Sequence, residues 1–285
     1  MNIKFKKNLS RVLPAIFIIL FFVSFLKPFE NNIFNIAFGD EDDNFVTGSW
    51  LLKGKELYRD VFFQHQPTPS IISAGVQKIT KPNTTFLLVK RHREFIFFYS
   101  LFWILLLTYR FGLIFALTGI TFELTKFTLL GNLFLAESLV AYPVMYVCVF
   151  VYSSYQKKKK VEKLEILFLL SLLLLIQLTL LPMLPFVLFS FLMIYIKEKK
   201  QRRFFILSSI GLIFIATIML IPFLDFRQYF IDTIVNILLE YIPSEAKYSP
   251  LFAILSVFFL PIKVFFLAND GFYLCLLYTS PSPRD

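Results

Sequence analysis

Cysteine and glycine are scarce in this chain, and each shortage argues against particular kinds of structural or binding site. Two cysteines among 285 residues form no disulfide framework and no metal-binding spacing, and they leave the redox compartment undetermined. The nine glycines include no glycine-rich phosphate loop, which argues against a soluble nucleotide-sugar site. No internal repeat and no low-complexity linker is present, so nothing indicates a repeat architecture.

Apolar residues, in contrast, are abundant. The chain is 57% hydrophobic and 19% aromatic, with a mean hydropathy of +0.70. A soluble domain averages roughly 45–50% apolar residues. Apolar runs of about 16–20 residues recur along the chain, close to the length that spans a hydrocarbon core. The sequence therefore predicts an all-α, polytopic bundle of transmembrane helices.

The net charge of +10 is concentrated in short clusters between the apolar runs. Such clusters favour the cytoplasmic side of a membrane, which assigns that side to Lys157–Lys160 and Lys197–Arg203. The N-terminus carries basic residues before the apolar run Val12–Leu26, and no small-residue cleavage site follows that run. We therefore expect an uncleaved first helix, a cytoplasmic N-terminus and a multi-pass protein of the cell membrane.

About eight spans are expected from runs of roughly membrane-spanning length. They are Val12–Leu26, Phe95–Tyr109, Phe111–Leu130, Leu133–Tyr155, two short helices within Leu164–Ile196 that turn at Pro182–Pro185, Phe204–Leu224 and Leu251–Leu267. Glu123 and Lys126 are three residues apart on one helix face, which predicts an ion pair near the outer end of the third span. Eight crossings place both ends of the chain inside.

Residues 28–94 form a long first loop that we expect outside the membrane. Asp40–Asp43 open a short amphipathic helix, because acids favour the positive end of the helix dipole, and Gly54 can supply the left-handed residue that stops it. Trp50 is expected to anchor this helix at the membrane interface. Two further interfacial helices are predicted at Thr68–Ile79 and Thr84–Arg93.

The four consecutive acids exceed what a helix start needs, since one acid is enough for a cap. Structural and functional roles are equally compatible with the run when composition alone is considered. Another polar group, His92, lies in Arg91-His92-Arg93, and its simplest interpretation is a basic patch that contacts lipid headgroups.

An ordered series of residues follows the first apolar run. It consists of Asp40-Glu41, then Leu51-Leu52-Lys53-Gly54, then the stretch Tyr58-Arg59-Asp60-Val61-Phe62-Phe63-Gln64-His65-Gln66-Pro67. This series resembles the first outer loop of the GT-C superfamily of membrane glycosyltransferases, in the branch of protein-mannosyltransferase-like and aminoarabinose-transferase-like proteins. Glu137 matches a second acid that this family carries between its third and fourth helices. The lysine step of the family's fifth helix is absent, and Gln177 and Pro182 match it only loosely.

The resemblance implies a glycosyltransferase that moves a sugar from a polyprenyl-phosphate donor to a lipid, glycan or protein acceptor at the extracytoplasmic face. It assigns catalysis to Asp40 and Glu41, positioning of the acceptor or a cation to Glu137 and Asp42, and donor-phosphate binding to Arg59 and His65. The sequence requires no cofactor, although a divalent cation is compatible with the acids. No nucleic-acid partner is expected.

The resemblance also sets the expected domain limits. Residues 1–275 are expected to form one GT-C-like domain, incomplete at its C-terminus, whereas Leu276–Asp285 reads as an artefactual tail. The main alternative is a non-catalytic transporter or lipid flippase, which would place polar groups in broken helices near the bilayer midplane. An inactive assembly partner on the same scaffold, and a membrane polymerase or ligase of O-antigen, are further alternatives.

Overall fold

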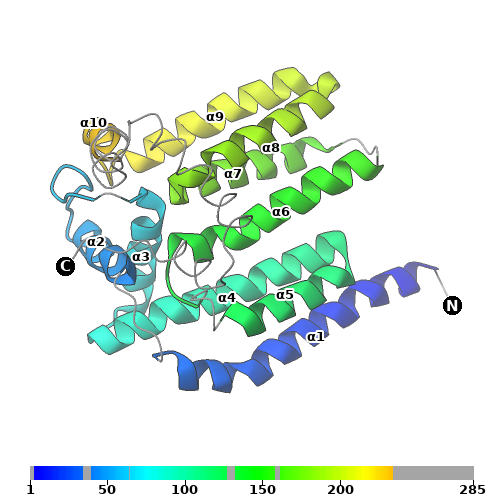
Figure 1. Cartoon of the computed structure of the whole chain (residues 1–285), viewed down its shortest axis with the longest axis horizontal. Coiled ribbons are helices and arrows are strands. Elements are labelled where there is room, and N and C mark those ends of the chain that lie inside the picture. The colour runs from blue at the N-terminus through cyan, green and yellow to red at the C-terminus, as the bar shows by residue number, and fades with distance from the viewer. Residues whose placement is uncertain (1–2, 35–39, 64, 127–131, 158–160, 234–285) are drawn as a thin grey trace, which may run out of the picture. The chain divides into compact units, whose positions relative to one another are not determined.

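The computed structural model describes residues 3–34, 40–63, 65–126, 132–157 and 161–233, and within these ranges the chain is helical, with no strand (Figure 1). The helices are α1 Ile3–Asn32, α2 Asp40–Leu52, α3 Pro67–Thr80, α4 Thr85–Phe111, α5 Leu113–Lys126, α6 Ala136–Lys157, α7 Lys163–Thr179, the 3-10 turn η1 Leu181–Met183, α8 Leu184–Lys197, the 3-10 turn η2 Lys199–Gln201, α9 Arg202–Leu220 and α10 Phe226–Phe230. The all-α prediction is confirmed for these residues.

Among the described residues, four helical segments are long and apolar enough to cross a membrane. They are Val12–Asn32, Thr85–Phe111, Ala136–Gln156 and Lys199–Leu220, and the shorter segment Leu181–Lys197 is also apolar. The expectation of a membrane-associated helical protein is therefore supported, whereas the number of eight spans and their orientation remain predictions. The predicted span Leu251–Leu267 and the tail Leu276–Asp285 lie outside the described residues.

One predicted helix boundary is wrong. The expected interfacial helix Thr84–Arg93 is the first part of α4, which continues without a break to Phe111. Thr84 is the N-cap, because its side chain accepts a hydrogen bond from the backbone N–H of Leu87, and no proline or glycine follows to interrupt the helix. The expected third span, Phe111–Leu130, corresponds to α5, which runs from Leu113 to Lys126, and its predicted end at residues 127–130 lies outside the described residues.

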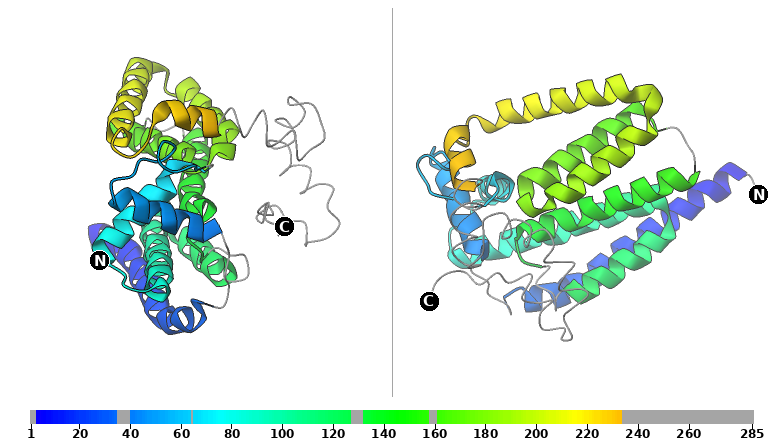
Figure 2. Two further views of the ribbon diagram at one scale, coloured as in Figure 1. Left: turned by 90° about the vertical axis from the view of Figure 1, so that its left-hand side faces the viewer. Right: turned by 45° about the horizontal axis from the view of Figure 1, so that its top comes forward.

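The described chain divides into two compact units. Unit 1 comprises Met1–Phe45 and Gly75–Lys159, and unit 2 comprises Val46–Ala74 and Lys160–Asp285. Within unit 1, α4 packs against α1, α5 and α6 (Figure 2). The buried side of α4 runs through Arg93, Ile96, Ser100, Trp103 and Leu107, a spacing of three and four residues that keeps one helix face toward its neighbours. Two members of this buried stripe are polar, and both take part in ion-pair clusters.

Within unit 2, α7 packs against both α8 and α9, and these helices lie side by side in Figure 1. The predicted turn at Pro182–Pro185 is confirmed, because α7 ends at Thr179, η1 follows and α8 begins at Leu184. Only the α7 face toward its neighbours is well buried, whereas α9 leaves most of its apolar side chains exposed. An exposed apolar surface of this kind is expected of a helix that faces lipid.

The start and end of α2 agree with the sequence. All four acids lie in its first turn, and Gly54, just beyond its end, has a φ of +77°. α3 matches the predicted helix 68–79 within two residues. In unit 2, a Cβ on Gly48 would lie 2.9 Å from the backbone nitrogen of Ala74, so glycine permits the close approach of α2 and α3. Trp50 is exposed as an interfacial anchor would be, whereas Leu51 packs into a protein core with Leu57 and Phe63.

Candidate functional site

The first turn of α2 is attached to α4 through a buried ion pair. Glu41 is 2% exposed, and its two carboxylate oxygens accept hydrogen bonds from Arg93, from Nε at 3.2 Å and from Nη2 at 2.5 Å. A buried carboxylate is costly unless it is paired, and a two-point contact with arginine also fixes its orientation. Glu41 therefore holds the acid-bearing helix start in one place on unit 1.

The same pair connects two further segments of unit 1. The remaining guanidinium nitrogen of Arg93, Nη1, donates to the carbonyl of Ile33, just after α1. The backbone N–H of Phe134, just before α6, donates to Glu41 Oε1 at 2.6 Å. Four segments from three widely separated parts of the sequence thus meet at one pair of side chains, which we call the Glu41–Arg93 hub.

His92 packs beside the hub, which contradicts the predicted headgroup-contacting patch for two of its three residues. The ring of His92 is fully buried, 4.3 Å from the ring of Phe45 and 4.8 Å from that of Phe134 (centre to centre). Its Nδ1 lies 2.7 Å from the Leu88 carbonyl, which can only accept, so Nδ1 carries the proton. Successive helix residues point about 100° apart, so Arg91 stays exposed while His92 and Arg93 face the protein interior.

The other predicted acids lie close to the hub along the chain. Asp40, the first residue of α2, is half-buried, and Asp42 is exposed. Glu137 is half-buried in the first turn of α6, three residues after Phe134. Because Phe134 is hydrogen-bonded to Glu41, the start of α2 and the start of α6 share one end of unit 1. Acids separated by more than ninety residues in the sequence are thereby brought to one region.

A second buried cluster lies deeper along α4. Lys126 Nζ lies 2.7 Å from Glu123 Oε2 and donates to Ser100 Oγ at 2.8 Å, and the Tyr142 hydroxyl donates to Glu123 Oε1. The predicted Glu123–Lys126 pair is confirmed, but its side chains are 0% and 3% exposed instead of lying at an accessible helix end. These contacts join α4, α5 and α6. A Cβ on Gly119 of α5 would lie 2.7 Å from Ile104 of α4, so glycine allows the close packing.

In unit 2, the Tyr-Arg-Asp stretch forms a compact loop after α2. Tyr58 is buried with a φ of +69°, and its hydroxyl donates to the carbonyl of His65 at 2.7 Å. The Asp60 carboxylate accepts the backbone N–H of Glu56 at 2.9 Å, and the Tyr58 N–H donates to the Val61 carbonyl at 2.8 Å. Tyr58 and Asp60 thus have local structural roles in this loop.

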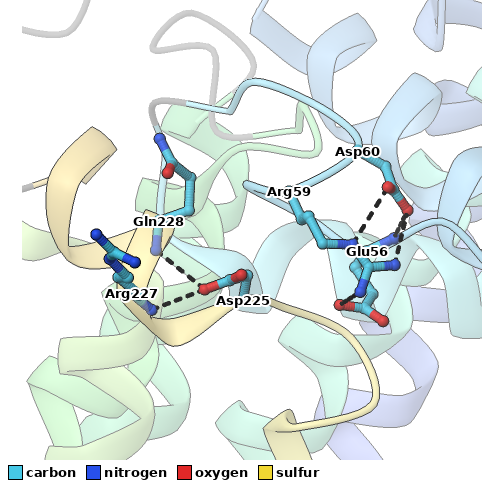
Figure 3. Close-up of polar contacts among 6 residues, drawn as sticks. All are labelled: Glu56, Arg59, Asp60, Asp225, Arg227 and Gln228. Atoms are coloured by element: carbon cyan, nitrogen blue, oxygen red, sulfur yellow. Dashed lines mark hydrogen bonds and ion pairs between the residues drawn. The ribbon is translucent and has the colours of Figure 1, made fainter.

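Arg59 points outward from this loop between two acids (Figure 3). Its guanidinium lies 2.8 Å from Glu56 and 3.3 Å from Asp60. The hydrogen bond to Asp60 raises the pKa of Arg59, and the hydrogen bond from the Glu56 N–H, followed by that from Arg59, lowers the pKa of Asp60. The charge of this predicted phosphate-binding residue is therefore already shared with two carboxylates.

The loop is docked on the segment before and within α10, also in unit 2. Leu57 N–H donates to the Phe223 carbonyl at 2.8 Å, and Asp225 N–H donates to the Leu57 carbonyl at 3.2 Å. Asp225 also caps α10 through the N–H groups of Arg227 and Gln228 (Figure 3). These backbone contacts fix the loop that carries Arg59 and ends at His65.

Tyr58 of this loop also packs in a small cluster with Tyr229 and Gln66. Tyr229 donates its hydroxyl proton to Gln66 Oε1 at 2.8 Å, and its ring lies 5.1 Å from the ring of Tyr58. Burial raises the pKa of the Tyr58 phenol far above its ordinary value, and Tyr229 and Asp232 add to the rise. Tyr58 is therefore a structural hydroxyl that remains protonated. Next to this cluster, the half-buried His65 contacts the Phe63 ring edge-on, with the ring centres 5.4 Å apart.

The fold and these clusters define a helical, membrane-associated protein whose acid-bearing helix is anchored to a membrane-type helix by a buried arginine. Within the ranges that the structure describes, no three His, Cys, Asp or Glu side chains come together as metal ligands, and the predicted compatibility with a divalent cation stays a prediction. No family model, curated protein or solved structure matches the chain.

Proposed function

We propose that the chain is an integral-membrane glycosyltransferase that moves a sugar from a polyprenyl phosphate to a lipid, glycan or protein acceptor at the extracytoplasmic face. The observation that carries this proposal is the Glu41–Arg93 hub, which holds the Asp40-bearing start of α2 beside the lead-in to α6 and its Glu137. An ordered acid series next to a first apolar helix is what the resemblance to the GT-C superfamily requires. The buried pair supports the proposal because it immobilises that series.

The reaction would proceed by displacement at the anomeric carbon. An acceptor hydroxyl loses its proton to a carboxylate as its oxygen bonds to the anomeric carbon. The bond between that carbon and the phosphate oxygen breaks, and the lipid phosphate leaves with the electron pair. Cationic groups stabilise the charge that develops on the leaving phosphate.

We assign the proton transfer to Asp40. Both oxygens of Glu41 are engaged by Arg93 and Phe134, so Glu41 acts as the residue that positions α2. Glu137 and Asp42 are assigned to orienting the acceptor or a cation. Arg59 and His65 remain the predicted donor-phosphate residues, and a phosphate at Arg59 would have to compete with Glu56 and Asp60.

A second candidate is a transporter or flippase, and the Glu123–Lys126 cluster is the observation that favours it. Ionisable residues inside a membrane bundle commonly mark ion or substrate paths. Here, however, Lys126 is paired with Glu123 and Ser100, and Glu123 also accepts from Tyr142, so the charged groups of the cluster are paired with one another. Charged groups that are already paired with one another favour a structural role, and we therefore rank transport second.

The test is the loss of a labelled sugar from its polyprenyl phosphate in membranes that contain the expressed chain. Asp40→Asn retains size while removing the proton acceptor, so the transfer rate should fall by about 10²–10⁴-fold with little loss of donor binding. Asp43→Ala is the matched control, another first-turn acid whose loss should cost about 1 kcal/mol or less of helix stability. Equal rates for Asp40→Asn and the unmodified chain would refute the mechanism, and equal losses at both positions would indicate a structural acid cluster.

A further inference from the structure

The segment that opens α7 and the basic turn between α8 and α9, both in unit 2, are joined at one end of these helices. Gln201 Nε2, in the turn between α8 and α9, donates to the Val161 carbonyl before α7 at 2.7 Å. Lys163 Nζ, at the start of α7, lies 5.4 Å from the centre of the Phe204 ring in α9. These contacts unite the start of α7, the end of α8 and the start of α9 in one surface, which we call the basic end.

Cations dominate the basic end. They are Lys163, Lys197, Lys199, Lys200, Arg202 and Arg203, against the acids Glu162, Glu165 and Glu198. Glu198 is buried next to the Gln201 amide, and Arg202 is held 4.8 Å from the Tyr195 ring. Lys163, Lys199, Lys200 and Arg203 are exposed. Glu162 is also exposed and Glu165 is half-buried, so the accessible surface carries a net positive charge, and the contacts of Gln201 and Lys163 hold its segments together.

Exposed apolar side chains adjoin these cations directly. Leu164 follows Lys163 and is 77% exposed, and Ile196, Ile206 and Leu207 are also exposed beside the turn. The turn opens the apolar segment Lys199–Leu220, one of the four long enough to cross a membrane. A cationic rim directly above an apolar surface is the profile of a lipid with an anionic headgroup and acyl chains, and a soluble anion would not use the apolar part.

We propose that the basic end binds the phosphate headgroup of an anionic phospholipid, with the exposed cations on the phosphate and the lipid's acyl chains along the start of α9. The proposal is independent of the proposed sugar transfer, because it uses none of the residues assigned to that reaction. Anionic headgroups attract each nearby cation, and neutralising one weakens binding by about fivefold.

The experiment measures phosphatidylglycerol bound to the purified chain in zwitterionic detergent by native mass spectrometry. Lys199→Gln/Lys200→Gln/Arg203→Gln should weaken binding by about 100-fold, and the charge-retaining Lys199→Arg/Lys200→Arg/Arg203→Lys should bind like the unmodified chain. Lys53→Gln/Lys55→Gln/Lys78→Gln is the matched control, because it removes three other exposed cations and should leave binding unchanged. Gln201→Ala keeps every cation and should weaken binding through loss of the contact to Val161.

Three outcomes would overturn the proposal. They are equal binding by the Gln triple variant and the unmodified chain, an equal loss in the control variant, and tight binding of glycerol phosphate, which lacks acyl chains. If the Gln triple variant does not fold, salt titration of the unmodified chain decides instead, since an electrostatic headgroup contact must weaken as ionic strength rises. Unchanged lipid binding between low and high salt would contradict an anionic-headgroup site.

Discussion

In unit 1 the ion pairs Glu41–Arg93 and Glu123–Lys126 have side chains that are at most 4% exposed, whereas in unit 2 Arg59 is 54% exposed and its partners Glu56 and Asp60 are 29% and 26% exposed. The Glu41–Arg93 pair joins helices distant in sequence. Glu123 and Lys126 both lie in α5 and connect it to α4 and α6 through Ser100 and Tyr142, whereas the exposed pairs join neighbours within one loop. Removing one partner of a buried pair leaves an uncompensated charge, while an exposed pair contributes little. Ion pairs of the same residue types therefore stabilise the fold where they are buried and contribute little where they are exposed, as in the Arg59 loop.

The largest effect is expected at Lys126. Lys126→Met leaves the buried Glu123 without its cation, and we expect a loss of about 3–5 kcal/mol in the free energy of unfolding. Glu123→Gln/Lys126→Met removes both charges and should recover much of that loss. Urea unfolding in detergent, followed by tryptophan fluorescence, measures both variants. If the single variant were as stable as the unmodified chain, the Glu123–Lys126 cluster would not support unit 1.

A much smaller effect on stability is expected at Arg59. Arg59→Gln should change the free energy of unfolding only slightly, because its ion pairs are exposed and screened by solvent. If Arg59 binds the donor phosphate, however, the KM for the lipid-linked sugar should rise by roughly tenfold or more, as expected for the loss of a hydrogen bond to a charged group. Lys53→Gln, another exposed cation after α2, is the control. An unchanged KM would remove Arg59 from the proposed reaction.

The smallest effect is a local dependence on pH around Asp60. The pKa of Asp60 is lowered in the folded loop, so its contribution to loop stability is complete above the unfolded pKa of about 4 and is lost as the pH falls through the folded value. Hydrogen exchange at the Glu56 amide, corrected for its intrinsic rate, should lose protection as the pH falls below about 4. Asp60→Asn should lack this transition, and the same transition in that variant would assign it elsewhere.

The sequence predicted those features that depend on neighbouring residues. Hydropathy located the apolar helices, the first-turn acids and Gly54 bounded α2, and the spacing of three residues predicted the Glu123–Lys126 pair. These signals are readable because capping, helix periodicity and pairing on one helix face act over a few residues.

The contacts that depend on tertiary packing were not predicted. Arg93 was interpreted as a headgroup contact, since nothing in Arg91-His92-Arg93 shows which side faces inward. The buried residues Arg93, Ser100 and Leu107 repeat every seven residues, which places them on one helix face. This spacing was the signal in the sequence that could have indicated that Arg93 faces the protein interior. Tyr142 and Tyr229 carried no local signal, because their partners Glu123 and Gln66 come from other elements.

The most direct test of this account is a double-mutant cycle on the Glu41–Arg93 hub. Glu41→Gln and Arg93→Met are made singly and together, and the free energy of unfolding is measured for all four proteins. Residues in direct contact through a buried ion pair should show a coupling energy of about 1–3 kcal/mol, with the double variant less damaged than the two single losses added together. A coupling energy near zero would show that Arg93 does not hold the start of α2, and would contradict the account.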